Sequence, residues 1–201
     1  MTVDLSAYII THRTHPVWGK LPAILEAFRK YPNADWVWWL DVDAVIMNPE
    51  VNLYEHLLAP SVLQRSLTDG EPILQLNEEF VAVASGLRTQ RHSPDQIDLI
   101  ISQDHAGLNA GSFFIRNTPM MRFFIDMWSD PLITERAISW SQREQDALTY
   151  LIVNHPFLFE RVGFVPQRLI NSYAREPGLW QTGDLVIHFA GCWYAPPSVR
   201  C

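Results

Sequence analysis

Apolar residues along the 201-residue chain fall into short continuous runs that alternate with stretches of helical periodicity. Residues 21–31 place apolar side chains at helical spacing, with a proline where a first turn would be, and are predicted to form a helix. The run WVWWL at 36–40 has the length of a strand, and its continuous hydrophobicity is typical of a strand in the middle of a parallel sheet.

The same pattern predicts the remaining elements. Helices are expected just after residue 49, over 119–128 and over 143–153. Strands are expected over 3–10, in two short runs within 73–84, and over 97–102, 111–116, 161–165 and 185–189, with a surface loop over 85–98. The alternation of the two kinds of element indicates one α/β domain.

The composition of the chain argues against some classes of function. The 15 basic and 22 acidic residues give a net charge of -7, which argues against a broad nucleic-acid-binding face. No apolar run reaches the roughly 20 residues of a membrane-spanning helix. The 8 tryptophans are numerous; indole faces can stack on sugar rings, but Trp36, Trp38 and Trp39 can equally fill a core or shape a rim.

An acidic pair, Asp41 and Asp43, follows the apolar run directly. On an extended chain, residues two apart point to the same face, so both carboxylates would emerge at the carboxyl end of a strand, where open α/β sheets bind ligands. Hard carboxylate oxygens suit Mg²⁺ or Mn²⁺, which can bridge to a substrate phosphate. A solvated turn or a helix cap is the alternative interpretation of this pair.

Three further segments carry candidate chemistry. His188 leaves a predicted strand just before a glycine, where its imidazole could be a third Mn²⁺ ligand or a hydrogen-bonded structural group. Asn109 precedes small residues that would allow a ligand to approach the backbone, or it forms a turn. Glu144 and Gln145 begin a predicted helix, where they could face a cleft or simply complement the helix dipole.

Taken together, these segments resemble one family. The strings WWLDVDAVIMNPE, LNAGSFFIRN, EQDALTYL with VGFVPQRLINSY, and LVIHFAGC occur in this order in the fungal and plant galactosyl/mannosyltransferases of the GMA12/MNN10 type. HPVWGKLPAI is similar to the family's segment upstream of the acidic pair. The resemblance implies a GT-A-like nucleotide-sugar-binding fold, with a mixed, mostly parallel sheet flanked by helices.

The resemblance also assigns roles to matching positions. The metal, Mn²⁺ or Mg²⁺, would be held by Asp41, Asp43 and His188, and Gln145 and Glu144 would lie near the anomeric carbon as the catalytic pair. The donor would be bound by Lys20 near the phosphates, Asp41, Asn109, Gly111, Ser112, and Gly191 beside the diphosphate. These roles are implied by the family and not by the spacing of the residues.

The implied activity is metal-dependent transfer of a hexose, with retention of configuration, from a nucleotide-diphosphate sugar to a glycan hydroxyl. The string QDHAGLNAGSFFIRNTP favours GDP-mannose, with UDP-galactose as the alternative. Other glycosyltransferase subunits are possible partners. A glycoside hydrolase and a non-catalytic sugar-binding subunit are the competing classes, of which the hydrolase fits less well because its two carboxyl groups come from different elements.

The family places its catalytic domain in the Golgi lumen, on a membrane anchor that this chain does not contain. Its domain begins earlier, with a first strand and helix that hold the nucleotide base, so residues 1–201 are predicted to be a partial catalytic domain lacking these elements. In an oxidising lumen Cys192 and Cys201 could form a disulfide, and two free thiols are the alternative.

Overall fold

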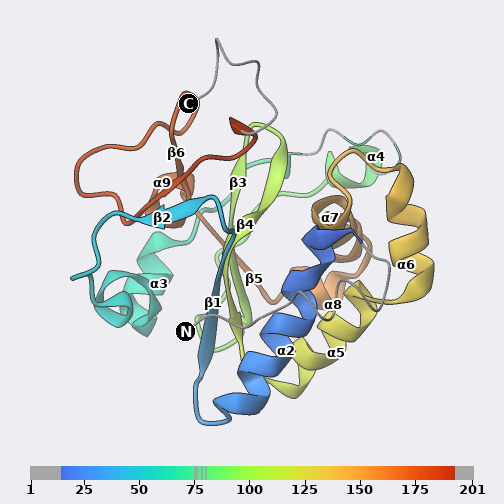
Figure 1. Ribbon diagram of the computed structural model, residues 1–201, viewed down its shortest axis with the longest axis horizontal. Helices are drawn as coiled ribbons and strands as arrows, with labels where there is room; N and C mark the ends of the chain where they lie inside the picture. The colour runs from blue at the N-terminus through green and yellow to red at the C-terminus, as the bar shows by residue number, and fades with distance from the viewer. Residues whose placement is uncertain (1–14, 75–76, 78, 80, 193–201) are drawn as a thin grey trace.

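The computed structural model describes residues 15–74, 77, 79 and 81–192. Its centre is a four-stranded sheet with the order β1-β4-β3-β5 (Figure 1). The strands are β1 (Trp36–Leu40), β3 (Leu99–Asp104), β4 (Gly107–Arg116) and β5 (Val162–Val165). β4 pairs antiparallel with both β1 and β3, whereas β3 and β5 are parallel, so three strands run in one direction and β4 runs against them.

A smaller sheet lies beside the carboxyl end of β1. It has the order β2-β7-β6, formed by β2 (Ala44–Ile46), β7 (Val186–His188) and β6 (Ser172–Tyr173). β2 and β7 are antiparallel, with Ala44 opposite His188, and β6 and β7 are parallel, with Tyr173 beside His188. These pairings place His188 next to the residues that follow β1.

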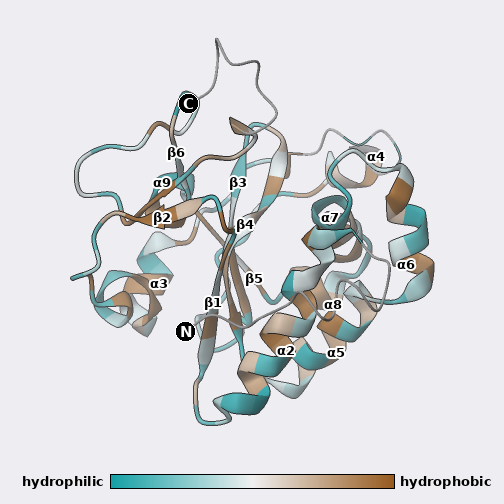
Figure 2. Cartoon of the chain, viewed as in Figure 1, coloured by the Kyte–Doolittle hydropathy of each residue, from teal (hydrophilic) through white to brown (hydrophobic). Residues whose placement is uncertain are grey.

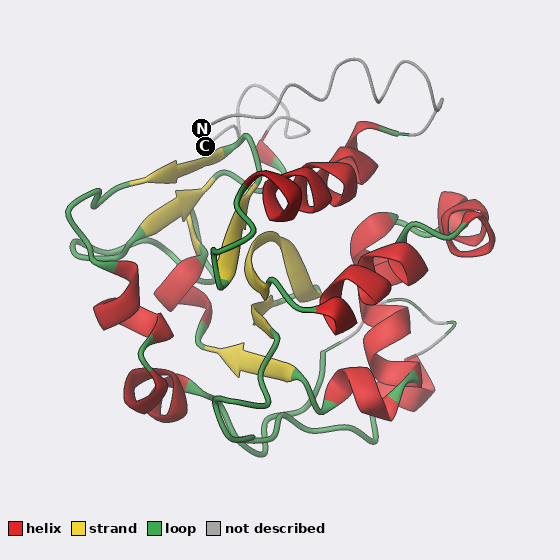
Figure 3. Cartoon of the chain, turned by 90° about the horizontal axis from the view of Figure 1, so that it is seen from below, coloured by secondary structure: helices red, strands yellow, loops and turns green. Residues whose placement is uncertain are grey.

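Helices lie on both sides of the strands (Figure 3). One side of the main sheet is covered by the 3₁₀-helix η1 (Pro16–Gly19), α2 (Lys20–Lys30), α4 (Val81–Ala84), α5 (Pro119–Trp128), α6 (Pro131–Arg136), the 3₁₀-helix η3 (Ala137–Ser139), α7 (Glu144–Asn154) and α8 (Pro156–Phe159). The other side carries the π-helix η2 (Tyr54–Leu58), α3 (Pro60–Ser66) and α9 (Gln167–Ile170). Among the described residues, no helix is both long and apolar enough to cross a membrane.

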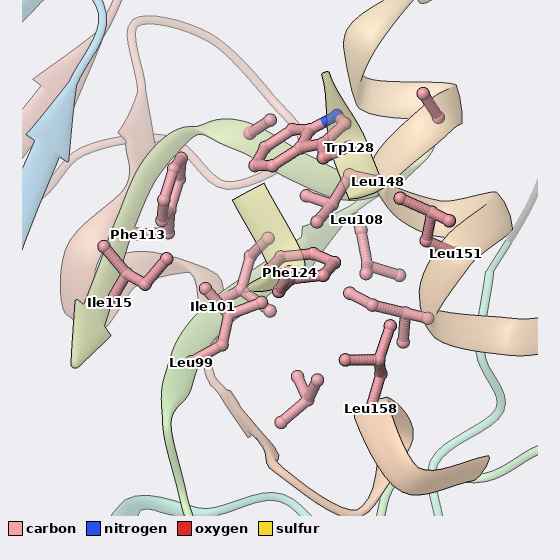
Figure 4. Close-up of a cluster of buried hydrophobic side chains, with 14 of the residues drawn as sticks. Leu99, Ile101, Leu108, Phe113, Ile115, Phe124, Trp128, Leu148, Leu151 and Leu158 are labelled. Carbon is pink, nitrogen blue, oxygen red and sulfur yellow. The ribbon is translucent and has the colours of Figure 1, made fainter. Parts of the chain in front are cut away.

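The core has two parts, one on each face of the main sheet. On the α2–α5–α7 face, Phe113 and Ile115 pack with helical side chains such as Trp128 and Leu148 (Figure 4). On the other face, Phe114 lies in a second cluster with residues of η2, α3 and α9. Because side chains alternate along a strand, β4 contributes to both clusters, and Figure 2 shows the central strands as mostly hydrophobic.

Several predicted elements agree with the structure and others do not. The bounds 36–40 and 119–128 are confirmed, and the helix at 143–153 is shifted by one residue. The 36–40 strand is not in the middle of a parallel sheet: in the described part it lies at the sheet edge, pairs antiparallel with β4, and has half-buried side chains. Two strands within 73–84 were a wrong prediction for 81–84, which is helical, and residues 3–10 lie outside the described part.

Candidate metal and donor site

The acidic pair lies in a tight turn between β1 and β2. The Ala44 amide donates to the Asp41 carbonyl over 3.0 Å, and the Asp41 amide donates to the Gly111 carbonyl over 2.8 Å. The Phe189 amide donates to the Asp43 carbonyl over 2.9 Å, which joins the turn to the end of β7. The carboxylates are therefore brought together by a turn and not, as predicted, by alternation along an extended strand, and Val42 between them is fully exposed.

Asp41, Asp43 and His188 converge on one point. Each offers one ligand atom, and these atoms all lie within 4.8 Å of one another. Two ligands of a single Mn²⁺ or Mg²⁺, each about 2.0–2.4 Å from the ion, can be at most about 4–5 Å apart, so the spacing fits one cation. Two carboxylate oxygens and one imidazole nitrogen also form a donor set that suits Mn²⁺.

The imidazole of His188 is buried between two polar partners. Its Nε2 lies 3.2 Å from Asp43 Oδ1, and its Nδ1 lies 2.8 Å from Asn171 Oδ1. The hydrogen bond with His188 lowers the pKa of the Asp43 carboxyl, although partial burial opposes this shift. Asp43 is therefore ionised at neutral pH and available to a cation.

Lys20 lies beneath Asp41 and is 3% exposed. Its ammonium group is 2.9 Å from Glu144 Oε1 and 3.3 Å from Asp41 Oδ1, and it donates to the Ala110 carbonyl over 2.9 Å. Burial lowers the pKa of Lys20, but the charges of Glu144 and Asp41 outweigh it and the net pKa is raised. The resemblance implied a phosphate contact for Lys20, whereas the structure shows a buried cation that ties α2 to β4 and α7.

Glu144 and Gln145 begin α7 and reach the same region. Glu144 is buried against Lys20, while the half-buried Gln145 accepts a hydrogen bond from the Ala110 amide over 2.9 Å. The residue before them, Arg143, has a φ of 43°, a conformation that costs roughly 1–3 kcal/mol and is found mainly at functional sites. Helix-dipole compensation alone therefore does not account for this pair, because both side chains make specific contacts with the residues around Asp41.

Asn109 belongs to a buried hydrogen-bonded cluster. Its Nδ2 donates to Asp104 Oδ2 over 2.8 Å and to the Tyr173 hydroxyl over 2.7 Å, and its Oδ1 accepts from the Gly111 amide over 2.8 Å. Tyr173 also donates to Asp104, and burial followed by the charge of Asp104 raises the pKa of Tyr173 strongly. Asn109 lies within strand β4 and fixes the backbone at Gly111, whose carbonyl accepts from the Asp41 amide.

Gly111 and Ser112 were expected to line the donor sugar, and the structure gives both of them packing roles. A Cβ on Gly111 would lie 2.3 Å from His188 Cε1, so only glycine leaves room for the imidazole. Ser112 is fully buried, donates to the Ile170 carbonyl over 2.7 Å and accepts from Trp38 Nε1 over 3.2 Å. The Ser112 hydroxyl therefore connects β4 with β1 and α9 and faces no open space.

Gly191 is exposed and has a φ of 72°, a left-handed conformation that glycine adopts without strain. It follows β7 closely, and the exposed Arg175 reaches it: Arg175 Nη2 lies 4.0 Å from where a Gly191 Cβ would be. A positive side chain thus lies at the same end of the small sheet as His188, a member of the candidate metal cluster. Cys201 is outside the described residues, so its pairing with Cys192 stays a prediction.

Some residues of the site carried no recognisable signal in the sequence. Trp39 donates from Nε1 to Asp41 Oδ1 over 2.6 Å, although the apolar run indicated only burial or a rim position. Asp104, Asn171 and Tyr173 were not singled out because isolated polar residues in short segments show no periodicity. Asn171 and Tyr173 do lie within the string VGFVPQRLINSY, which was used for the family resemblance but not for the site.

The fold is that of a glycosyltransferase. The structure matches, with a TM-score of 0.57 and 14% identity, the crystal structure of a glycosyltransferase involved in the glycosylation of the major capsid of PBCV-1, over 87% of this chain and 69% of that one. The chain itself belongs to the galactosyl transferase GMA12/MNN10 family, whose model matches residues 1–197.

Relatives in this family carry the names of two different sugars. The chain is 44% identical over 193 residues to the probable alpha-1,2-galactosyltransferase gmh1 of Schizosaccharomyces pombe, covering 95% of this chain and 57% of that protein. It is 33% identical over 196 residues to the probable alpha-1,6-mannosyltransferase MNN10 of Saccharomyces cerevisiae, covering 90% and 48%. The chain thus spans about half the length of these curated relatives.

Proposed function

We propose that this chain carries the metal and donor site of a metal-dependent glycosyltransferase, which moves a hexose from a nucleotide-diphosphate sugar to a glycan hydroxyl. The observation that carries the proposal is the convergence of Asp41, Asp43 and His188 within 4.8 Å, in a chain of this family. Two carboxylates in one turn, beside a histidine on the neighbouring strand β7, suit a cation. They do not flank a sugar ring from opposite sides, as the carboxyl pair of a glycoside hydrolase does.

The bound Mn²⁺ or Mg²⁺ would act as a Lewis acid that stabilises the charge on the departing diphosphate. The chain prepares this site by orienting its own ligands: Lys20 and Trp39 fix one oxygen of Asp41, and His188 fixes Asp43. Arg175, exposed beside Gly191, lies where it can neutralise a further phosphate charge. A binding site for a diphosphate next to a cation is the arrangement these residues support.

Retention of configuration requires either a protein nucleophile or attack of the acceptor on the same face that the diphosphate leaves. Glu144 is buried and ion-paired with Lys20, which makes its carboxylate a poor nucleophile, and Gln145 offers only an amide oxygen already bonded to Ala110. These contacts favour front-face attack, in which the leaving phosphate accepts the proton of the acceptor hydroxyl. In this mechanism Glu144 and Gln145 shape the site around the anomeric carbon.

The donor in this proposal is GDP-mannose, which the string QDHAGLNAGSFFIRNTP favours, with UDP-galactose as the alternative, since relatives are named for each of the two sugars. The acceptor is a glycan, and the whole protein acts in the Golgi membrane with this domain in the lumen, alone or with other glycosyltransferase subunits. These statements extend the family membership to the particular reaction and are supported by the motif resemblance described above.

The test measures Mn²⁺ binding and sugar transfer with the purified chain. Calorimetry with Mn²⁺ should show one site that is lost in Asp43→Asn and kept in Asp69→Asn, an exposed control aspartate. Release of labelled hexose from GDP-mannose or UDP-galactose should require Mn²⁺ and stop with EDTA, and the faster donor identifies the sugar. Mn²⁺ binding without turnover would favour a non-catalytic sugar-binding subunit, and absence of Mn²⁺ binding would refute the metal site.

A further inference from the structure

His188 is held by a residue that plays no part in the reaction scheme above. Asn171 follows α9 and is completely buried, and its Oδ1 lies 2.8 Å from His188 Nδ1. Its backbone is anchored, since the Asn171 amide donates to the Gln167 carbonyl over 2.8 Å and its carbonyl accepts from Gln167 Nε2 over 3.3 Å. The anchored backbone therefore holds the Asn171 side chain in a fixed position against the imidazole.

The chemistry of this contact selects one form of the imidazole. A carboxamide oxygen can only accept, so the nitrogen that faces it, Nδ1, must carry a hydrogen. In the neutral ring the other nitrogen, Nε2, then has the free electron pair, and Nε2 is the atom that faces Asp43 at 3.2 Å. Without a cation, Asp43 accepts a hydrogen bond when Nε2 carries a hydrogen. With a cation between the two groups, the lone pair of Nε2 binds the cation instead, and this is the orientation that a metal ligand needs.

The burial of Asn171 supports a specific role. Among the described residues, its Nδ2 is buried and has no hydrogen-bond partner. An unsatisfied buried amide costs about 1–3 kcal/mol, whereas an apolar side chain of similar size would avoid this cost. The only hydrogen bond of the Asn171 side chain within the described part goes to His188, so the benefit of a polar residue here is confined to that ring.

The rest of the surroundings fixes where the ring lies but not which nitrogen carries hydrogen. Gly111 leaves space for the ring, and Tyr173 packs edge-to-face against it with the ring centres 5.7 Å apart. Neither contact distinguishes Nδ1 from Nε2. Asn171 and Asp43 are the partners whose chemistry bears on that distinction, and with a cation between Nε2 and Asp43 the direct hydrogen-bond partner of the ring is Asn171.

We propose that Asn171 is a positioning residue that holds the Nδ1–H of His188 and thereby directs Nε2 toward the bound cation. The inference rests on the proposed metal site, but it makes a separate claim about the hydrogen on the ring. Outer partners of metal-binding histidines typically contribute 10–100-fold to metal affinity.

The binding test compares two substitutions. Asn171→Leu keeps the size and removes the acceptor, and it should weaken Mn²⁺ binding by about 10–100-fold, measured by electron paramagnetic resonance of free Mn²⁺. Asn171→Asp keeps an acceptor oxygen and should bind Mn²⁺ much more tightly than Asn171→Leu. Asn154→Leu, at the exposed end of α7, is the matched control and should bind as the wild type does. Equal affinity of Asn171→Leu and wild type would overturn the proposal.

A second measurement needs no Mn²⁺, and its first result comes from the wild-type protein alone. Nitrogen-15 spectra of labelled histidine, with diamagnetic Mg²⁺ present, should show hydrogen on Nδ1 of His188 in the wild-type protein, and the preference should disappear in Asn171→Leu. Hydrogen on Nε2 alone in the wild type would overturn the proposal even if the variants failed to fold. If the wild type binds no metal but keeps the Nδ1–H, the metal site fails while the role of Asn171 in selecting the tautomer stands.

Discussion

The two aspartates of the site lie two residues apart, yet different parts of the molecule hold them. Asp41 is tied to the main-sheet body through the buried Lys20 and through Trp39, both of which engage its Oδ1. Asp43 is tied to the small sheet, where His188 on the three-residue strand β7 is its partner. Asp41 is therefore paired with a buried lysine beside the main core, whereas Asp43 is paired with an imidazole on a short strand.

This difference separates stability from metal binding. The Lys20 contacts join α2, β4 and α7 beside the main core, so their loss should affect the whole fold. The contacts of Asp43 and His188 join only the small sheet to the turn. Their loss should therefore lower the affinity for a cation more than it lowers the stability of the fold. Substitutions on the two sides should therefore have different effects, and the largest is expected at Lys20.

Replacing Lys20 by methionine should destabilise the protein most. Removing one partner of a buried ion pair leaves an uncompensated charge, here on Glu144, and typically costs about 3–5 kcal/mol. Urea denaturation should show this loss, and Lys30→Met, on the exposed end of the same helix, should change the free energy of unfolding by less than about 0.5 kcal/mol. A loss below about 1 kcal/mol for Lys20→Met would show that the pair does not hold the three elements together.

The pH dependence of this effect has a definite sign. Since Glu144 and Asp41 raise the pKa of Lys20 above its unfolded value, its contribution is fully present below the unfolded pKa and is lost as the pH rises through the folded pKa. The stability difference between wild type and Lys20→Met should therefore be constant near neutrality and shrink only above about pH 10. A difference that instead shrinks between pH 6 and 8 would contradict the assignment to Lys20.

The position of His188 is most sensitive to Gly111, the residue of β4 that lies against its ring. Alanine there would place a Cβ 2.3 Å from His188 Cε1, so the ring or the strand must move. Overpacking of this kind costs about 1–3 kcal/mol, and displacement of a ligand should lower Mn²⁺ affinity further. Gly86→Ala is a suitable control, because the nearest atom to its Cβ would be 3.8 Å away. Unchanged Mn²⁺ affinity in Gly111→Ala would show that the position of His188 is not critical.

More of the main sheet and its helices than of the small sheet β2-β7-β6 could be predicted from the sequence. The bounds of β1 and α5 follow from local runs and periodicity, which depend on neighbouring residues only. The edge position of β1, the turn at the acidic pair and the two- and three-residue strands β6 and β2 depend on pairings between distant segments. Such pairings leave no periodic pattern. The wrong strand prediction at 81–84 and the unrecognised helix α9 have a different cause, because both are helices of four residues and are too short to show helical periodicity.

The candidate site divides in the same way. The residue types at Asp41, Asp43 and His188 allowed a cation site as one of two interpretations, and the family resemblance favoured it. The contacts that hold them, from Lys20 to Asp41 and from Asn171 to His188, join residues that are distant in the sequence. Ser112 lies in a recognised motif, yet its position facing the core could be known only from the packing of β4 against α9.

Ser112→Ala tests whether this residue is structural. Its hydroxyl satisfies both the Ile170 carbonyl and Trp38 Nε1, so its removal should cost about 1–2 kcal/mol of unfolding free energy. The apparent affinity for the nucleotide sugar should change less than twofold. Ser139→Ala, at the end of η3, provides an exposed control. A large rise in KM with unchanged stability would instead support the expected donor contact.

The smallest effect is expected at Asp146, which follows the Glu144–Gln145 pair and bonds to Gln142 and Asn77. Its carboxyl is 4% exposed and accepts hydrogen bonds from the Gln142 amide and the Asn77 side chain, and burial raises its pKa despite them. For an acid with a raised pKa, stability is greatest below the unfolded pKa and is lost as the pH rises through the folded pKa. Asp146→Asn removes that loss and keeps an acceptor oxygen. The variant should therefore be more stable than the wild type at pH 7 and equally stable near pH 3.5. Denaturation curves at both pH values measure the difference. Asp126→Asn, on the exposed face of α5, should show no such pH-dependent gain. If Asp146→Asn is less stable than the wild type at pH 7, the ionised carboxylate stabilises the first turn of α7. In that case its charge also contributes to the electrostatic balance around Lys20, together with Glu144 and Asp41.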